Sequence, residues 1–187
     1  MIRNKLLIAI VLFSVLFISC NSGNKFKVSK GMVGSLTTKT TMQELEKIFK
    51  NDSIVKNLSE GSLGDNYFQD DDEYHIFEKG GKHLLTIVPK EQLDSTSTIK
   101  SIQIFDNRFE TETGISLNST FVDINLKSTI NKVETSFSSA TLFIDELNAT
   151  IAIDKEQLGL KEFSTQKVNL DQIPDLAEIK SFIIWFN

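Results

Sequence analysis

The 187-residue sequence contains few of the residues on which cross-linked or metal-bound folds depend. It has one cysteine, two histidines and two prolines. A single cysteine excludes an intramolecular disulfide and a cysteine-based zinc site. The 25 acidic residues outnumber the 20 basic ones, and the formal charge of −5 argues against nucleic-acid binding. The apolar share of 40% is ordinary for a globular protein and argues against general disorder.

Motifs for common chemistry are also scarce. The sequence has no phosphate-binding loop, no dinucleotide fingerprint and no Gly-x-Ser-x-Gly elbow. If a two-residue glycine turn at 80–81 sets the register, His75 pairs with Thr86 and Glu78 with His83. The two rings then face opposite sides of a hairpin and cannot share a metal. We therefore predict no enzyme, no cofactor and no metal, although residue counts alone leave a Ser-His-Asp triad open.

The only long apolar run lies at the N-terminus. Arg3 and Lys5 precede the apolar segment 6–18, and Cys20 follows two positions later. This run is shorter than the roughly 20 apolar residues that a transmembrane helix needs. It also lacks the amphipathic pattern of a buried helix. We therefore predict a secretory signal peptide over residues 1–19, which is cleaved in the mature protein.

The segment that ends at the lone cysteine, residues 16–20, reads Leu-Phe-Ile-Ser-Cys and resembles the lipobox of bacterial lipoproteins. The resemblance implies that Cys20 is lipidated and that its new amino terminus is acylated, which gives stable anchoring. In that family Asn21, in place of Asp, favours sorting to the outer membrane. We expect an anchored protein that faces the periplasm, with residues 20–30 as lipidated cysteine and tether. Cleavage removes two basic residues and makes the formal charge −7.

An internal similarity recurs at an offset of 79 to 80 residues. Residues 98–105 match 178–185, with Ile-Lys-Ser in common, and residues 34–45 match 114–124. Two matches in one register favour a duplicated unit of about 80 residues. The alternative is chance similarity between amphipathic segments. We place unit 1 at 31–106 and unit 2, packed against it, at 107–187.

Each unit is expected to consist of a short helix followed by an antiparallel meander. Thr41-x-x-Glu44 and Thr120-x-x-Asp123 have the spacing of capping boxes, which mark helix starts. Hairpins are predicted at 74–77 with 83–88 and at 141–144 with 149–153, a central last strand at 179–186, and long loops at 52–72 and 154–176. The predicted fold class is α+β.

Two further resemblances concern this layout. The pattern Gly-x-Leu, then Thr-x-x-Glu-Leu ahead of a meander, resembles the modules of BamE/SmpA-type outer-membrane lipoproteins. The tandem arrangement is similar to the β-lactamase-inhibitor-protein-like fold. Both resemblances imply a non-enzymatic protein-binding or scaffold module that acts on an envelope protein. The alternatives are a periplasmic small-molecule or lipid binder and, in third place, an envelope hydrolase with paired carboxylates.

The acidic run Asp70, Asp71, Asp72 and Glu73 is the sharpest polar feature of the chain. Calcium needs six to eight oxygen ligands in a folded loop, and the spacing of an EF-hand is missing. We interpret the run as a solvated acidic loop, with a calcium site or a basic partner as the alternatives.

Overall fold

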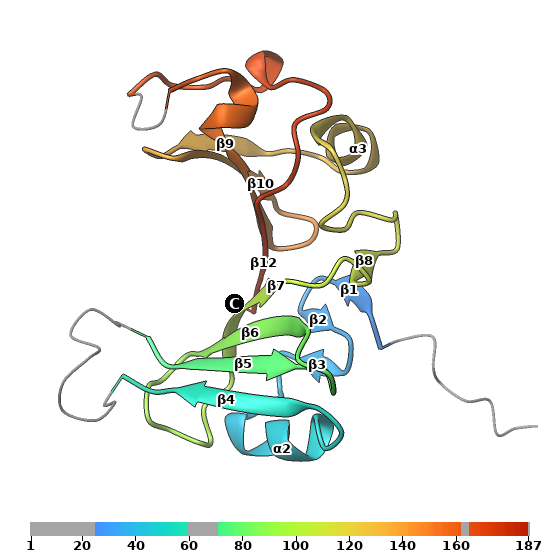
Figure 1. Ribbon diagram of the computed structural model, residues 1–187, viewed down its shortest axis with the longest axis vertical. Helices are drawn as coiled ribbons and strands as arrows, with labels where there is room; N and C mark the ends of the chain where they lie inside the picture. Colours follow the sequence, from blue (N-terminus) through green and yellow to red (C-terminus); the bar gives the residue numbers. More distant parts are fainter. Residues whose placement is uncertain (1–24, 60–70, 162–164, 187) are drawn as a thin grey trace, which may run out of the picture.

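The computed structural model describes residues 25–59, 71–161 and 165–186 (Figure 1). The predicted signal peptide and Cys20 lie outside these residues. Two sheets, one of eight strands and one of four, account for most of the described structure. None of the described helices has the length and apolar character needed to cross a membrane.

The eight-stranded sheet is antiparallel throughout and has the order β4-β5-β6-β7-β12-β11-β10-β9. Its strands are β4 (Ser53–Asn57), β5 (Glu73–Phe77), β6 (His83–Pro89), β7 (Ile99–Ile104), β9 (Lys132–Thr135), β10 (Ser139–Ile144), β11 (Ala149–Asp154) and β12 (Ser181–Trp185). The two predicted hairpins are confirmed as β5–β6 and β10–β11, and the last strand is central as expected. The predicted repeat stays a prediction; its boundary falls between β7 and β8 (Glu110–Thr111).

The four-stranded sheet is built mainly from the N-terminal segment. Its order is β3-β2-β1-β8, with β1 at Lys27–Ser29, β2 at Met32–Val33 and β3 at Leu36–Thr37. The turn before β3 requires a glycine, because Gly34 has a φ of 58° and a Cβ there would lie 2.5 Å from the Lys25 carbonyl oxygen. Residues 27–29, which we assigned to the tether, thus form a strand of this sheet.

The protein is mostly β, which corrects the predicted α+β class. The described α-helices are α2 (Leu45–Ile48) and α3 (Phe121–Lys127), of one or two turns each, and a 3₁₀ turn, η3 (Met42–Glu44), precedes α2. Helices this short are not stable alone and depend on packing. The first amides of η3 and α3 are tied to neighbouring loops, since the Met42 N–H donates to the Ser97 carbonyl and the Phe121 N–H donates to the Ala177 carbonyl. These helices are therefore short additions to a β core and do not form a layer of their own.

Both predicted capping boxes are present. The Glu44 carboxylate accepts the Thr41 N–H at 2.8 Å, and the Asp123 carboxylate accepts the Thr120 N–H at 2.9 Å. Each threonine also forms an isolated β-bridge, Thr41 to Thr98 and Thr120 to Glu178. The helix starts are therefore fixed both by their own side chains and by the chain ahead of β7 and β12.

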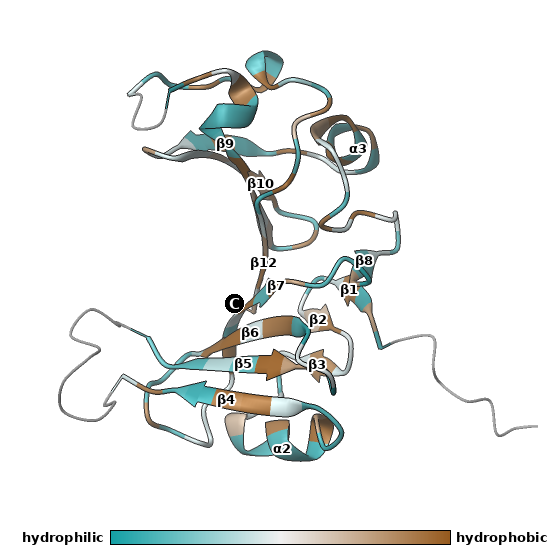
Figure 2. Ribbon diagram, viewed as in Figure 1, coloured by the Kyte–Doolittle hydropathy of each residue, from teal (hydrophilic) through white to brown (hydrophobic). Residues whose placement is uncertain are grey.

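One face of the eight-stranded sheet carries the core. The register aligns a row of side chains that are at most 1% exposed: Ile76, Leu85, Ile104, Phe182, Ile151 and Leu142. The four-stranded sheet and α3 lie on one side of the large sheet (Figure 1). Hydrophobic residues run along β2, β3 and β6 (Figure 2). Each such buried side chain contributes roughly 1.5–3 kcal/mol.

Candidate functional site

The other face of the eight-stranded sheet carries side chains that are mostly half-buried along its outer and C-terminal strands, although Thr86 in β6 and Ser101 in β7 are buried. Along β11, Ala149, Ile151 and Ile153 are buried, whereas the residues between them are half-buried. β10 and β12 show the same alternation. In the described part of the chain, then, no second layer buries this side of these strands. We call it the open face.

The strand register places one row of residues across all eight strands of the open face. The row consists of Val55, His75, Thr86, Gln103, Ile183, Thr150, Phe143 and Lys132. Lysine stands only at the edge strand β9, and the centre mixes hydroxyl, amide and apolar groups. A centre with few charges and some aromatic residues is typical of protein–protein interfaces.

The two histidines lie together at one end of the open face, which corrects the prediction that they point to opposite sides. His75 pairs with Thr86 as predicted. His83 instead pairs with Phe77, because a β-bulge shifts the register between β5 and β6. A shift of one residue moves a side chain to the other face of a strand. The centroids of the two imidazole rings are therefore only 5.7 Å apart.

The neighbouring acceptors indicate which ring nitrogen of each histidine carries a hydrogen. The Leu85 carbonyl only accepts, so His83 Nε2 carries the hydrogen that it donates at 3.1 Å. The Glu73 carboxylate lies 3.2 Å from His75 Nε2 and only accepts, so Nε2 carries the hydrogen of that contact. His75 Nδ1 then accepts from the Thr86 hydroxyl at 2.9 Å, and that hydroxyl lies 3.1 Å from His83 Nε2. The chain runs Glu73, His75, Thr86, His83.

Burial lowers the pKa of His83, and its neighbour His75 lowers it further, against the opposing effect of the hydrogen bond to Leu85. The neutral form of His83 is thus favoured. The carboxylate–imidazole–hydroxyl order resembles that of a nucleophilic triad. Thr86 is only 5% exposed, however, and a nucleophile must reach its substrate. The arrangement supports a structural role for this threonine.

An aromatic stack covers the histidine cluster. His83 lies between Phe77 and Phe105, with ring centroids 4.7 Å and 3.9 Å away. Phe105 is 41% exposed, although it is a large apolar side chain. Exposed aromatic residues on a partly buried platform are common anchors in protein interfaces.

A pocket of about 360 Å³ occupies the other end of the open face, over β10, β11 and β12. Its lining residues are Thr141, Phe143, Ile144, Asp145, Asn148, Ala149, Thr150 and Trp185. Trp185 Nε1 donates to the Thr150 hydroxyl at 3.0 Å, and Asn148 Nδ2 donates to the Trp185 carbonyl at 2.8 Å. Sequence reasoning missed this pocket; the only available signal was the single tryptophan of the chain.

One member of the acidic run, Asp72, is buried and not solvated as we predicted for the run. Asp70 lies outside the described residues. Asp72 is 1% exposed and accepts the N–H groups of Ser59 at 2.8 Å and Leu93 at 2.6 Å. Burial would raise the pKa of Asp72, but these hydrogen bonds outweigh it and hold the pKa below its ordinary value.

The other members of the run are also engaged. Asp71 forms an ion pair with Lys100 at 3.0 Å, and Glu73 contacts His75 as described above. Three of the four acids therefore bind groups of the protein. Among the described residues, no group of three or more histidine, cysteine, aspartate or glutamate side chains is arranged to hold a metal ion.

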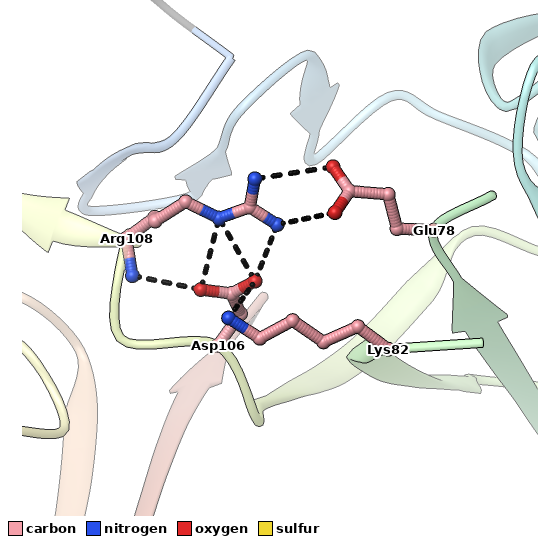
Figure 3. Close-up of polar contacts among 4 residues, drawn as sticks. All are labelled: Glu78, Lys82, Asp106 and Arg108. Carbon is pink, nitrogen blue, oxygen red and sulfur yellow. Dashed lines mark hydrogen bonds and ion pairs between the residues drawn. The ribbon is translucent and has the colours of Figure 1, made fainter. Parts of the chain in front are cut away.

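A cluster of four charged residues links the β5–β6 turn to the segment after β7 (Figure 3). Arg108 donates to both oxygens of Glu78, at 3.1 Å and 2.9 Å, and to Asp106, which Lys82 also contacts at 3.1 Å. Burial opposes ionisation of Asp106, but the hydrogen bonds from Arg108 prevail and lower its pKa to about 2. The Arg108 guanidinium also lies 4.4 Å from the Phe26 ring.

This charge cluster is structural in character. The Asp106 side chain is fully buried and its charge is balanced inside the cluster, so no carboxylate remains for chemistry. Through Phe26, which leads into β1, the cluster holds the small sheet against the large one. Sequence reasoning did not identify it, because its members come from separate turns.

Comparison with known proteins adds a fold but no activity. No family model and no curated protein matches the sequence. Among solved structures, the crystal structure of the uncharacterized protein yfeY from Escherichia coli is similar, with a TM-score of 0.53 and 14% sequence identity. The match covers 85% of this chain and 99% of the other. The likeness therefore concerns the fold alone.

Proposed function

We propose that this protein is a lipid-anchored, non-enzymatic protein-binding or scaffold module of the bacterial cell envelope. Its anchor is the lipid on Cys20, and its binding surface is the open face of the eight-stranded sheet. The lipobox-like residues 16–20 support the anchor. Asn21, which follows the cysteine, supports sorting to the outer membrane, where the folded domain would face the periplasm. The partner is another envelope protein.

The open face carries this proposal. Its aromatic side chains Phe105, Phe143 and Trp185 are partly exposed on a sheet whose backbone hydrogen bonds hold them in place. Such a platform is rigid, so a partner that binds it loses little conformational entropy in ordering this side of the interface. The row of residues across the eight strands of the open face has few charged side chains. This reduces the free-energy cost of removing water from it when a partner binds.

The buried carboxylates do not favour the hydrolase alternative. A glycoside hydrolase needs two carboxylates about 5–9.5 Å apart that face a cleft. Asp72 accepts backbone N–H groups, and Asp106 is neutralised by Arg108 and Lys82. Both side chains are thus occupied in holding loops, and neither lines the pocket on the open face.

One observation favours a lipid or small-molecule binder as the second candidate. A separate pocket of about 240 Å³ lies among Ile48, Phe49, Leu84 and Phe109, and Lys25 also lines it. Mass spectrometry of the natively purified protein tests this candidate. A bound lipid of defined mass, lost in a Leu84→Lys variant that still folds, would support it over protein binding.

Cell fractionation tests the anchor. Replacement of the lipidated residue, Cys20→Ala, is expected to release the protein from membranes, because the mature chain has no excess of basic residues to hold it on lipid headgroups. Ser22→Ala, two positions away, is the matched control and should stay in the membrane fraction. A Cys20→Ala protein that remains fully membrane-bound would show that the lipobox interpretation is wrong.

Site-specific crosslinking in cells tests the binding surface. A photoreactive residue at Phe105, on the open face, is expected to capture one envelope protein reproducibly. The control position is Leu126 of α3, which is 80% exposed and belongs to the helix on the core side of the sheet. Equal capture of the same protein from both positions, or capture from Leu126 alone, would contradict the assignment of the open face.

A further inference from the structure

We propose that the pocket between Phe143 and Trp185 binds an arginine side chain of the partner protein. This inference rests on the proposed protein-binding function and names the chemistry of the contact. The pocket lies on the open face and has a volume of about 360 Å³. That volume is at the lower end of the range for ligand pockets, which suits one long side chain and not an extended ligand.

The walls of the pocket favour a flat or cationic occupant. Phe143 and Trp185 supply two aromatic rings, from β10 and β12 on either side of Thr150 in β11. The faces of such rings carry partial negative charge and attract guanidinium and ammonium groups. The Lys132 ammonium already lies 5.4 Å from the centroid of the Phe143 ring. It also forms an ion pair with Glu134, so its own charge is balanced.

The rim of the pocket supplies a carboxylate. Asp145 follows β10, and its backbone is held in place, because its N–H donates to Asn131 at 2.9 Å and its carbonyl accepts from Lys30 at 3.3 Å. Its side chain is exposed, and among the described residues no cation forms an ion pair with it. Because the Asp145 backbone is fixed and its carboxylate is exposed, the carboxylate is suited to accept a hydrogen bond from a charged donor of the partner protein.

Arginine fits these features better than other side chains. Its planar guanidinium stacks on aromatic rings, and its five N–H donors match a carboxylate in a two-point contact. The Thr141 and Thr150 hydroxyls in the lining offer further acceptors for those donors. The formal charge of −7 on the mature chain attracts a basic partner as well. An aliphatic side chain would leave the carboxylate unused.

The single tryptophan makes the pocket directly observable. Trp185 is the only tryptophan of the chain, so its fluorescence reports on this pocket alone. The purified full-length protein is titrated with N-acetyl-arginine amide and with N-acetyl-citrulline amide, which has nearly the same shape but no charge. We expect a saturable change with arginine and at least tenfold weaker binding of citrulline.

Matched variants locate the charge. Asp145→Asn is expected to remove the preference for arginine over citrulline. Glu146→Gln changes the adjacent acid, which accepts the Thr129 N–H and does not line the pocket, and should keep the preference. Equal binding of the two probes, stronger binding of N-acetyl-leucine amide, or no fluorescence change with any probe would each overturn the proposal. Crosslinking from Phe105 is independent of these results and would still test the open face.

Discussion

The two halves of the large sheet differ in regularity. In the half built from β9 to β12, the ladders run without a register shift and the strands alternate between buried and half-buried residues. In the half built from β4 to β7, two β-bulges interrupt the ladders. The regular half carries the pocket at Trp185. The irregular half carries the histidine cluster and the cluster of charged residues around Asp106. A bulge thus brings together side chains that strict alternation would separate.

The two halves also differ in the buried residue that follows the central strand of each. Asp106 follows β7 and Phe186 follows β12, 80 residues later, and both side chains are fully buried. Asp106 is held by Arg108 and Lys82, whereas Phe186 packs in the hydrophobic core. One position depends on paired charges and the other on apolar burial. The free energy of unfolding should therefore respond differently to mutation at the two positions, and only the charged position should make it depend on pH.

The largest expected effect is at Phe186. Phe186→Ala removes a fully buried ring from the end of β12 and leaves a cavity, so we expect a loss of about 3–5 kcal/mol in the free energy of unfolding. Urea denaturation measures this loss. Phe137→Ala, at a phenylalanine that is 68% exposed, should change the free energy by less than about 0.5 kcal/mol. Similar losses for both variants would contradict the assigned core.

A smaller loss is expected at the charged counterpart. Asp106→Asn removes the ionised partner of Arg108 and should lower the free energy of unfolding at pH 7 by about 2 kcal/mol, on the basis of the pKa shift. The control Glu78→Gln changes a more exposed contact of the same arginine and should cost less. If Glu78→Gln proved the more damaging variant in urea denaturation, the buried aspartate would not be the centre of the cluster.

The pH dependence separates the two halves further. The pKa of Asp106 is about 2 in the folded protein and near 3.8 in the unfolded chain. Its contribution is therefore fully present above about pH 4 and is lost as the pH falls through about 2. We expect the difference in stability between the parent protein and Asp106→Asn to shrink over that window. Phe186→Ala should show no such convergence in denaturation curves recorded from pH 7 to pH 2.

The smallest effects are expected at the two capping boxes, which have corresponding positions in the two predicted units. Thr41→Ala and Thr120→Ala each remove the hydroxyl of a capping box and should each cost about 1 kcal/mol. Thermal unfolding of the two variants in parallel measures both losses. Thr129→Ala, outside any cap, serves as the control. A large difference between the two cap variants would show that the short helices do not play corresponding roles.

Local sequence patterns were enough for the elements that depend on neighbouring residues. The Thr-x-x-Glu and Thr-x-x-Asp spacings identified both helix starts, and turn residues between apolar segments identified both hairpins. Edge strands were missed: β4 and β9 lay in segments that we did not expect to form strands. Edge strands bury little on either side, so their polar residues hide the pattern.

The candidate site was less accessible to prediction, because it depends on register. One bulge moved His83 to the face that carries His75, and no local pattern reveals a bulge. The burial of Asp72 depends on Ser59 and Leu93, which are distant along the chain. The Trp185 pocket needs three strands side by side. Each of these features is a relation between segments.

The N-terminal residues of the chain predict export and lipid attachment at Cys20 from a short linear pattern, and this stays a prediction. Local spacing is likewise sufficient to predict the two helix caps, because each is a contact between residues three positions apart. The mostly β class, the small sheet made from β1 to β3 and the open face arise from long-range pairing of strands. Those pairings depend on where every other strand lies, and a local pattern contains no information on that.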